Sequence, residues 1–257
     1  MRLRTIEDAV AWIERVGIAL LFPKPDVVLP SLWEAVADTT EVTWAIRDEA
    51  GGHFSFTPEM ARVWSWKDEL PKRRLACVGL HLARTSSLVA PSLVGCVYAL
   101  TGRSGARDDF RDADLPELEL ELAEAALELG RPTTRTELRL LVGREKRLVD
   151  NAVNALQRKL VLTNAGTAER DSGWSATAHD LFARRWRTKL RALPTREQAR
   201  RTLAERVLAT AGDLSAADLA AALRLRRREA QEILEALGDA GRATRRDEDG
   251  IAVWRPR

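Results

Sequence analysis

The stretch that decides the fold is residues 130–174, GRPTTRTELRLLVGREKRLVDNAVNALQRKLVLTNAGTAERDSGW. A glycine ends one helix, a short second helix follows, and a turn leads into a longer third helix with basic residues at its start. An extended segment with a tryptophan closes the unit. Residues 212–254, GDLSAADLAAALRLRRREAQEILEALGDAGRATRRDEDGIAVW, follow the same plan at an offset of about 80 residues. The aligned positions are Gly130 and Gly212, Leu138 and Leu219, Val153 and Leu234, Leu156 and Leu237, and Trp174 and Trp254.

Three helices followed by a β-hairpin are the elements of a winged helix-turn-helix. We therefore predict a mainly α fold with small β-wings, in which tandem winged helix-turn-helix modules follow a helical N-terminal region. The predicted domains are residues 1–115, a helical and divergent winged-helix-like region, residues 116–182, the first winged helix, and residues 183–257, a basic linker helix and the second winged helix. Two such modules in tandem favour double-stranded or damaged DNA as the partner.

The composition is that of a folded chain, with 45% hydrophobic and 31% charged residues. No apolar run approaches the length that spans a bilayer, and the N-terminus has no signal-peptide layout. We therefore expect a cytoplasmic, nucleoid-associated bacterial protein with no membrane contact. Cys77 and Cys96 lie in apolar surroundings, which favours buried, reduced thiols.

Charge is distributed unevenly along the chain, although the formal net charge is only +3. Residues 182–257 hold 18 Lys and Arg against 11 Asp and Glu. The remainder of the chain carries a small acidic excess. A basic C-terminal part on a near-neutral body is typical of a protein that binds a polyanion.

The first third of the chain has weaker periodicity. Thr5 is placed to cap a helix that ends at Gly17, and Ser31 is placed to cap a second, short helix. We expect a loop over residues 39–60 and a basic helix that continues through Leu82. Residues 102–116 are polar and rich in helix breakers, which predicts a linker or domain boundary.

Three stretches of this region carry a family resemblance: VGIALLFPKPDVVLPSLWEAV (16–36), WSWKDELP (64–71) and PSLVGCVYALTG (91–102). They resemble the bacterial AlkZ-related proteins, smaller relatives of the AlkZ/YcaQ winged-helix DNA glycosylases, which unhook interstrand crosslinks and remove alkylated bases. The resemblance covers most of residues 6–210. It implies a mostly helical fold of tandem winged helices and a DNA ligand.

The catalytic hallmark of the glycosylases is a Gln-x-Gln or Gln-x-Asp motif that positions the attacking water. The glutamines of this chain are Gln157, Gln198 and Gln231, and the residues two positions later are Lys159, Arg200 and Ile233. None of the three fits the motif, so the resemblance does not carry glycosylase activity over to this chain. Catalysis therefore remains open.

The third helix of the first repeat predicts a DNA-reading face. Its buried stripe consists of Val149, Ala152, Val153, Leu156 and Leu160, at helical spacing. The opposite face holds Arg147, Asn151, Asn154 and Arg158. Asn bonds bidentately to adenine and Arg to guanine, which is the chemistry of major-groove readout. A polar helix face in water is the alternative.

The second repeat has basic residues where phosphates would lie. Arg224, Arg227 and Arg228 crowd the start of its third helix, and Gln231 follows one turn later. Arginines at the positive end of a helix suit phosphates better than bases. The wing adds Arg242, Arg245 and Arg246. We predict that this module holds the DNA backbone rather than reading sequence.

The sequence offers few groups for catalysis. His53, His81 and His179 do not have metal-ligand spacing, and no glycine-rich phosphate loop occurs, so we expect neither a metal nor a cofactor. Asp68 and Glu69, beside two tryptophans, are the candidate acids for a glycosylase that uses a carboxylate instead of the missing glutamines. A further alternative is a winged-helix module that binds a protein partner or acts as a transcriptional regulator.

Overall fold

The computed structural model describes residues 2–47, 54–168, 175–248 and 250–257. The fold is mainly α with small antiparallel sheets, which confirms the predicted fold class at this level. None of the described helices is long and apolar enough to cross a membrane. Trp174, which the repeat aligns with Trp254, lies outside the described residues.

Within the described residues, one order of elements occurs three times: helix, short strand, helix, helix, strand, strand. The N-terminal unit consists of α1 (Ile6–Val16), β1 (Ile18–Leu20), α2 (Leu32–Ala37), β2 (Ala45–Arg47), β3 (Phe54–Phe56), α3 (Pro58–Lys72), β4 (Cys77–Gly79) and β5 (Ser87–Val89). The middle unit consists of α5 (Glu117–Leu129), β6 (Thr133–Thr134), α6 (Arg135–Val142), α7 (Lys146–Arg158), β7 (Leu162–Ala168) and β8 (Ala176–Leu181). The C-terminal unit consists of α9 (Arg196–Ala211), β9 (Leu214–Ser215), α10 (Ala216–Leu223), α11 (Arg227–Asp239), β10 (Ala243–Glu248) and β11 (Ile251–Pro256).

The sheets of the three units share one topology. In each, the last strand lies in the centre and pairs antiparallel with the short first strand and with its hairpin partner, giving the orders β1-β5-β4, β6-β8-β7 and β9-β11-β10. The N-terminal unit differs by one insertion, because the β2–β3 hairpin separates α2 from α3. The N-terminal unit therefore matches the middle and C-terminal units in connectivity, although its sequence periodicity is weak.

The same local chemistry begins the second helix of each unit. Each is preceded by a Ser or Thr that accepts a hydrogen bond from the backbone three residues later, where an acidic side chain bonds back to the cap. The pairs are Ser31 with Glu34, Thr134 with Glu137, and Ser215 with Asp218. The backbone N–H of Thr134, with Arg131, lowers the pKa of Glu137 to about 2. These reciprocal bonds fix where the second helix starts in every unit.

Two expectations for the N-terminal region were wrong. The predicted loop over residues 39–60 contains the hairpin β2–β3, in which Ala45 pairs with Phe56. The predicted helix through Leu82 ends at Lys72, and Arg74, with φ 58°, turns the chain toward β4. Both strands are only three residues long, so their pairing partners stabilise them and local periodicity does not reveal them.

The stretch expected as a linker, residues 102–116, is packed. It follows η1 (Pro91–Leu93) and α4 (Val94–Ala99) and contains η2 (Asp109–Asp112), in which Asp109 and Phe110 are buried. The Tyr98 hydroxyl donates to the Asp109 carboxylate at 2.6 Å, and Arg103 donates to the carbonyl oxygens of Lys159 and Leu160. This segment therefore holds the C-terminal end of α7.

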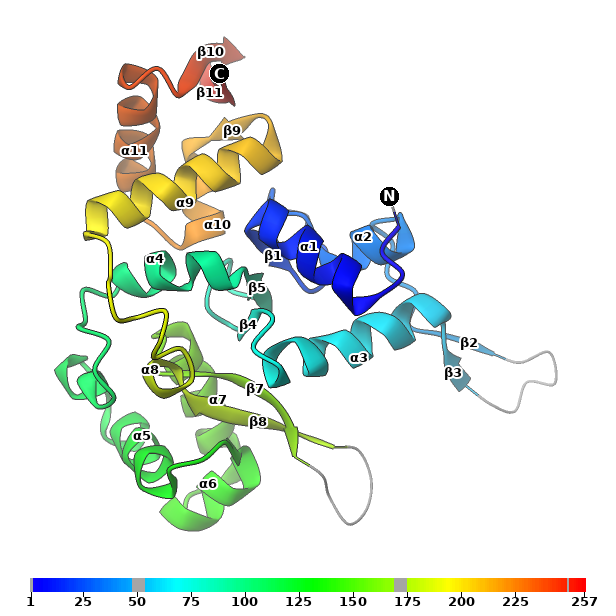
Figure 1. The fold of residues 1–257 in the computed structure, drawn as a ribbon, viewed down its shortest axis with the longest axis vertical. Coiled ribbons are helices and arrows are strands. Elements are labelled where there is room, and N and C mark those ends of the chain that lie inside the picture. Colours follow the sequence, from blue (N-terminus) through cyan, green and yellow to red (C-terminus); the bar gives the residue numbers. More distant parts are fainter. Residues whose placement is uncertain (1, 48–53, 169–174, 249) are drawn as a thin grey trace.

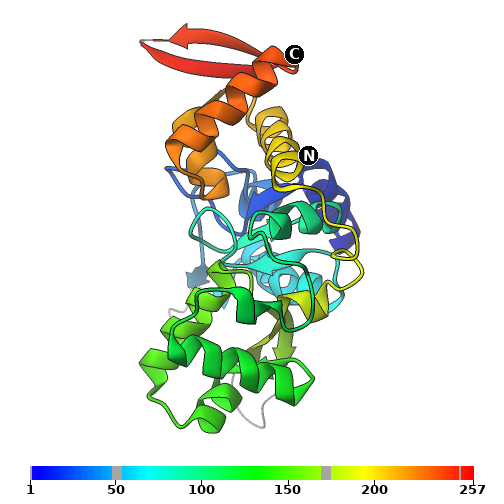
Figure 2. The same cartoon turned by 90° about the vertical axis from the view of Figure 1, so that its left-hand side faces the viewer.

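The segment that connects β8 of the middle unit to α9 of the C-terminal unit contains α8 (Phe182–Arg185). Phe182 and Trp186 are buried in a hydrophobic core that also contains residues of β1, β5, α4 and the C-terminal unit. Two smaller cores lie within the N-terminal and middle units. Figure 1 shows the C-terminal unit above α4, the middle unit below it and the N-terminal unit to the right. The turned view in Figure 2 places the middle and C-terminal units at the two ends of the long axis.

Candidate nucleic-acid interface

The turn between β4 and β5, residues 80–86, lies at the junction of the three units. On one side, the backbone N–H of Leu80 donates to Oε1 of Gln157 on α7. On the other, the N–H of Ala83 donates to the carbonyl oxygen of Ala222 on α10, at 3.2 Å. Arg224 closes the arrangement, because its guanidinium donates to the carbonyl oxygens of His81 and Arg158 at 3.3 and 2.7 Å. The hairpin of the N-terminal unit is thereby held between the other two units.

His81 anchors this turn in a buried polar network. Its Nδ1 lies 2.9 Å from the carbonyl oxygen of Gln157, so Nδ1 carries the proton and donates. Its Nε2 lies 3.1 Å from the oxygen of the Thr163 hydroxyl, which itself donates to the carbonyl oxygen of Val78 at 3.2 Å. Burial lowers the pKa of His81 to about 4 and that of His179, on β8, to about 3. Both imidazoles are therefore neutral at physiological pH.

We expect acid to destabilise the protein through these two histidines. The unfolded chain binds a proton at each below its ordinary pKa of 6.5, whereas folded His81 resists protonation down to about 4. Stability contributed by the neutral ring is thus complete above pH 6.5 and is lost as the pH falls toward 4, by about 3 kcal/mol for His81. Urea unfolding from pH 7.5 to 4.5 measures this slope. His81→Gln removes one titrating group, so its slope should be flatter by about one proton; an unchanged slope contradicts the assignment.

A group of four cations surrounds the turn, and we call Lys24, Arg84, Arg158 and Arg224 the junction cations. Lys24 comes from the loop after β1, Arg84 from the turn itself, Arg158 from the end of α7 and Arg224 from the end of α10. None of the four forms an ion pair with another residue of the described chain. Burial and the charges of Arg158 and Arg84 lower the pKa of Arg224. Arg224 therefore lies close enough to Arg158 and Arg84 for their positive charges to disfavour its own.

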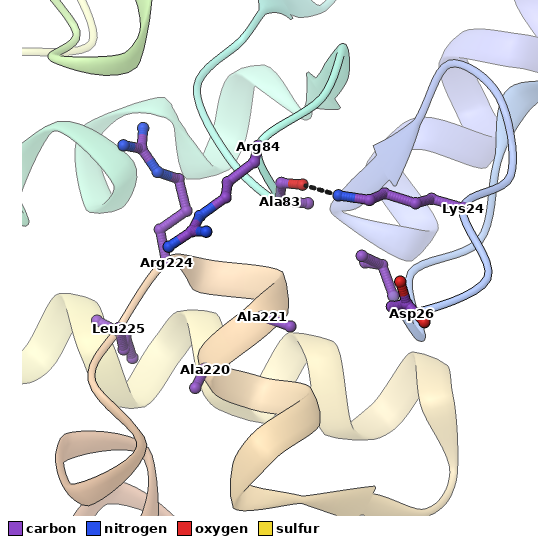
Figure 3. A pocket seen from close by; sticks show the side chains of 9 residues that line it. Lys24, Asp26, Ala83, Arg84, Ala220, Ala221, Arg224 and Leu225 are labelled. Atoms are coloured by element: carbon purple, nitrogen blue, oxygen red, sulfur yellow. Dashed lines mark hydrogen bonds between the residues drawn. The ribbon is translucent and has the colours of Figure 1, made fainter.

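Three of the junction cations line one cavity of about 420 Å³, together with Asp26 and the helical residues Ala220 and Ala221. Figure 3 shows Lys24 and Arg84 on opposite sides of Ala83, with Arg224 at the end of α10. Nζ of Lys24 donates to the carbonyl oxygen of Ala83 at 3.3 Å, and within the described parts of the chain its other two protons have no acceptor. An anion bound here would offset the mutual repulsion of the cations.

A second pocket, of about 460 Å³, lies on the other side of the turn; we call it the carboxamide pocket. Its walls come from β4, α6, α7, β7 and β8. The side chains that matter for its chemistry are Arg135, Asn154, Gln157, Asn164, Thr177 and His179. The carbonyl oxygen of each carboxamide already accepts a hydrogen bond, from Arg135, Leu80 and Gly166 respectively. None of the residues that line this pocket carries a carboxylate.

The predicted reading face of α7 divides between these sites. Arg147 and Asn151 are exposed, Asn154 is half-buried in the carboxamide pocket, and Arg158 is exposed at the junction. The predicted buried stripe from Val149 to Leu160 is confirmed.

The candidate phosphate contacts of the C-terminal unit are mostly engaged with acids. Arg228 pairs with Glu232, Gln231 donates to Glu235, and Arg245 pairs with Asp247. Arg242 lies 3.9 Å from Glu205. Arg227 and Arg246 are exposed and form no ion pair with a described residue. Arg224, predicted here as part of this set, instead points to the junction.

Asp68 and Glu69, the candidate catalytic acids, lie on α3 away from both pockets. Asp68 pairs with Lys67 at 2.8 Å, and the Lys67 ammonium lies over the ring of Trp64. Glu69 lies 3.6 Å from Lys72. Both carboxylates therefore have cationic neighbours on their own helix, and neither residue lines either of the two pockets. His53 lies outside the described residues.

Sequence reasoning missed Lys24 and Arg84. Lys24 lies in a proline-rich loop, and Arg84 follows a segment that was expected to be helical. The runs ACVG and SLVA on either side of Arg84 are the signal that would have indicated a hairpin with Arg84 in its turn. No local pattern places Lys24 beside Arg224, because 200 residues separate them in the chain.

The fold and the junction define a mainly helical protein with small antiparallel sheets and a cationic site where its three units meet. The chain belongs to the AlkZ-related family, whose model matches residues 3–224. Among solved structures, the chain is similar to the DNA glycosylase AlkZ of Streptomyces sahachiroi, with 18% identity and a TM-score of 0.47. That match covers 70% of this chain and 52% of the other, so the chain spans about half the length of that protein. The comparison with curated proteins gave no match.

Proposed function

We propose that the three units are winged helices and that the protein binds DNA, with the sugar-phosphate backbone against the junction cations. We keep the boundaries expected from the sequence in this proposal: residues 116–182 for the middle module and residues 183–257 for the C-terminal module with its linker helix. The observation that carries the proposal is the convergence of four unpaired cations from three units. Like charges brought together without ion pairs are unfavourable in the free protein, and a polyanion would compensate them.

Membership in the AlkZ-related family supports the same ligand, since the similar Streptomyces protein is named as a DNA glycosylase. The protein would bind DNA without catalysing a reaction on it. No glutamine of the chain fits the Gln-x-Gln motif, and Asp68 and Glu69 lie outside both pockets. DNA contacted through phosphates is bound with little dependence on sequence. Arg147 on α7 and Arg227 on α11 are exposed and form no ion pair with a described residue, so they would extend the contact into the middle and C-terminal units.

The test is the affinity for a plain duplex at several salt concentrations. We expect log K to fall with log salt at a slope of about 0.9 for each phosphate neutralised. Arg84→Gln and Arg158→Gln should each lower that slope by about 1. Together they should weaken binding on the order of 100-fold, since each removes charge-assisted hydrogen bonds worth on the order of 1.5 kcal/mol.

A matched control removes the same two charges elsewhere. Arg111 and Arg131 are exposed and already paired with Glu124 and Glu137. The double variant Arg111→Gln, Arg131→Gln should bind DNA much as the parent does. Equal weakening by both double variants would show that net charge alone matters, and no binding of the parent at low salt would refute the proposal.

A further inference from the structure

A second group of unpaired cations lies on and beside the segment that connects α8 to α9. Residues 182–196, FARRWRTKLRALPTR, contain six Lys and Arg and no Asp or Glu. Arg184 and Arg185 are engaged, because both lie within ion-pair distance of Asp180. The other four are exposed and form no ion pair with a described residue, and we call them the connector cations: Arg187, Lys189, Arg191 and Arg196.

The segment that carries them is packed tightly, with its large apolar side chains turned inward. Trp186 and Leu190 are 3% and 4% exposed and belong to the largest hydrophobic core. A Cβ on Gly95 of α4 would lie 3.0 Å from the carbonyl oxygen of Lys189. Gly105 makes room in the same way, since a Cβ there would lie 2.9 Å from Cβ of Leu190. The cations therefore extend from a backbone that is already ordered, so a ligand would bind them with little further loss of main-chain entropy.

The composition of this surface favours a nucleic-acid backbone over a protein partner. Besides the connector cations, the exposed residues between 187 and 196 are Thr188, Ala192 and Thr195. None of the large hydrophobic residues that are exposed in the described chain lies in this range. The centre of a protein–protein interface is usually apolar. Arginine and lysine side chains with no acid among them instead match a row of phosphates, and neutralising each phosphate releases counterions.

The connector cations and the junction cations lie on opposite faces of the molecule. In Figure 1 the yellow segment between α8 and α9 passes in front of the end of α4, whereas α10 lies behind α9. Figure 2 shows the same segment along one edge of the molecule and α10 along the other. The junction turn belongs to the α10 side, because the N–H of Ala83 donates to the carbonyl oxygen of Ala222. A straight duplex that contacts the junction cations therefore cannot reach the connector cations.

We propose that the connector cations bind a second DNA duplex, so that one molecule of the protein bridges two duplexes or two distant segments of one DNA. This inference rests on the proposed DNA binding at the junction and adds a second binding site to it. Arg187, Lys189 and Arg191 would each neutralise a phosphate of the second duplex, without contact to its bases. The two duplexes repel each other, and the cations on the two faces of the protein would offset that repulsion.

The experiment measures how many short duplexes one protein molecule holds at low salt, by analytical ultracentrifugation with two duplexes that carry different dyes. We expect both dyes to sediment with a single protein monomer. Formation of this complex should decrease with log salt at a slope of about 0.9 for each phosphate that the connector cations neutralise. One duplex for each protein molecule, whether as a monomer or a dimer, would overturn the second site and leave the proposed function standing. No duplex at all would overturn both.

A triple variant removes three connector cations and leaves the junction cations in place: Arg187→Gln, Lys189→Gln, Arg191→Gln. It should bind one duplex as the parent does and weaken capture of the second on the order of 100-fold or more, since each cation neutralises one phosphate. The matched control replaces three exposed arginines that already pair with Glu124, Glu137 and Glu121, and it should still hold two duplexes: Arg111→Gln, Arg131→Gln, Arg144→Gln. Equal loss in the two variants, with thermal unfolding like that of the parent, would overturn the assignment.

Vesicles of phosphatidylserine and phosphatidylcholine distinguish DNA from a membrane as the partner, because basic segments also bind anionic lipid surfaces. We expect the parent and the triple variant to bind these vesicles equally little at the salt concentration where two duplexes are held. Vesicle binding that the triple variant loses, together with one duplex for each protein molecule, would assign the connector cations to a lipid surface and overturn the bridging of DNA.

Discussion

Replacing Asp109 by Ala is expected to destabilise the protein by about 3–5 kcal/mol, the usual cost of removing one partner from a buried ion pair. The Asp109 carboxylate accepts from the Tyr98 hydroxyl at 2.6 and 2.8 Å and from the Gly105 N–H at 2.6 Å. It also lies 3.5 Å from the Arg103 guanidinium, and both side chains are nearly fully buried. Without it, a charge, a hydroxyl and a backbone N–H are left in the interior without their acceptor.

The consequence reaches beyond the connecting segment. Arg103 also donates to the carbonyl oxygens of Lys159 and Leu160, at the end of α7. Freed from Asp109, the guanidinium would move toward water and release the C-terminal end of the helix that carries Asn154 and Arg158. Thermal unfolding should show a decrease in Tm on the order of 10 °C for a chain of this size.

Two further variants make the prediction specific. Asp109→Asn keeps the shape and one acceptor but not the charge, so it should fall between the parent and Asp109→Ala. Asp112→Ala, an exposed neighbour in η2 with no hydrogen bond or ion pair from its side chain within the described chain, should change stability by less than about 0.5 kcal/mol. A loss of stability for Asp109→Ala no larger than for Asp112→Ala would contradict the role assigned to the buried pair.

The second large effect is expected at Gly166, where β7 passes α3. Gly166 has φ 104° and follows a register shift in the pairing of β7 with β8. A Cβ built on it would lie 2.7 Å from Cβ and 3.2 Å from Cα of Lys72. Contacts that close to backbone force α3 and β7 apart. Backbone strain and overpacking together predict a loss of about 3 kcal/mol for Gly166→Ala.

Gly143→Ala is the matched control. Its φ of 63° is also positive, but a Cβ there meets nothing within 4 Å. It should therefore cost only the backbone strain, about 1 kcal/mol. Urea unfolding of both variants separates the two contributions, and equal losses would show that the approach of β7 to α3 is not tight.

The reactivity of Cys77 tests whether Gly166→Ala destabilises the protein at this interface. The Cys77 thiol is buried between β4 and β7, 3.7 Å from the Thr163 hydroxyl, and burial raises its pKa to about 12. A buried thiol with so high a pKa is unreactive. In Gly166→Ala the interface should open, and Cys77 should react faster with a thiol reagent, as followed by mass spectrometry of its peptide. Cys77 that remains as protected as in the parent would place the loss of stability elsewhere.

In the contacts between the units, arginine side chains donate to the carbonyl groups at helix ends. Arg185 donates to the carbonyl oxygens of Pro71 and Lys72 at the end of α3, and Arg206 to those of Glu14 and Arg15 at the end of α1. A guanidinium suits this position because a helix C-terminus presents unpaired carbonyls with partial negative charge. These arginines count toward the basic C-terminal part of the sequence but hold the fold together.

The sequence by itself determined the elements that local chemistry specifies. Capping residues and terminal glycines defined α1, α2 and the helices of the two repeats, and helical spacing identified the buried stripe of α7. Three uncommon stretches, residues 16–36, 64–71 and 91–102, also indicated the family. Such signals act between residues a few positions apart, so they are readable without the fold.

Only the tertiary structure decided the third occurrence of the element order and both pockets. The strands β1, β4 and β5 are three residues each and exist through long-range pairing. Lys24, Arg84, Arg158 and Arg224 come from four separate segments, and whether an arginine is free, paired with an acid or bonded to a carbonyl depends on neighbours distant in the chain. Arg228 and Arg224 look alike in the sequence, yet one pairs with Glu232 and the other bridges two units. The sequence therefore gives the number of charged side chains, and the packing of the folded chain decides which of them can contact a ligand.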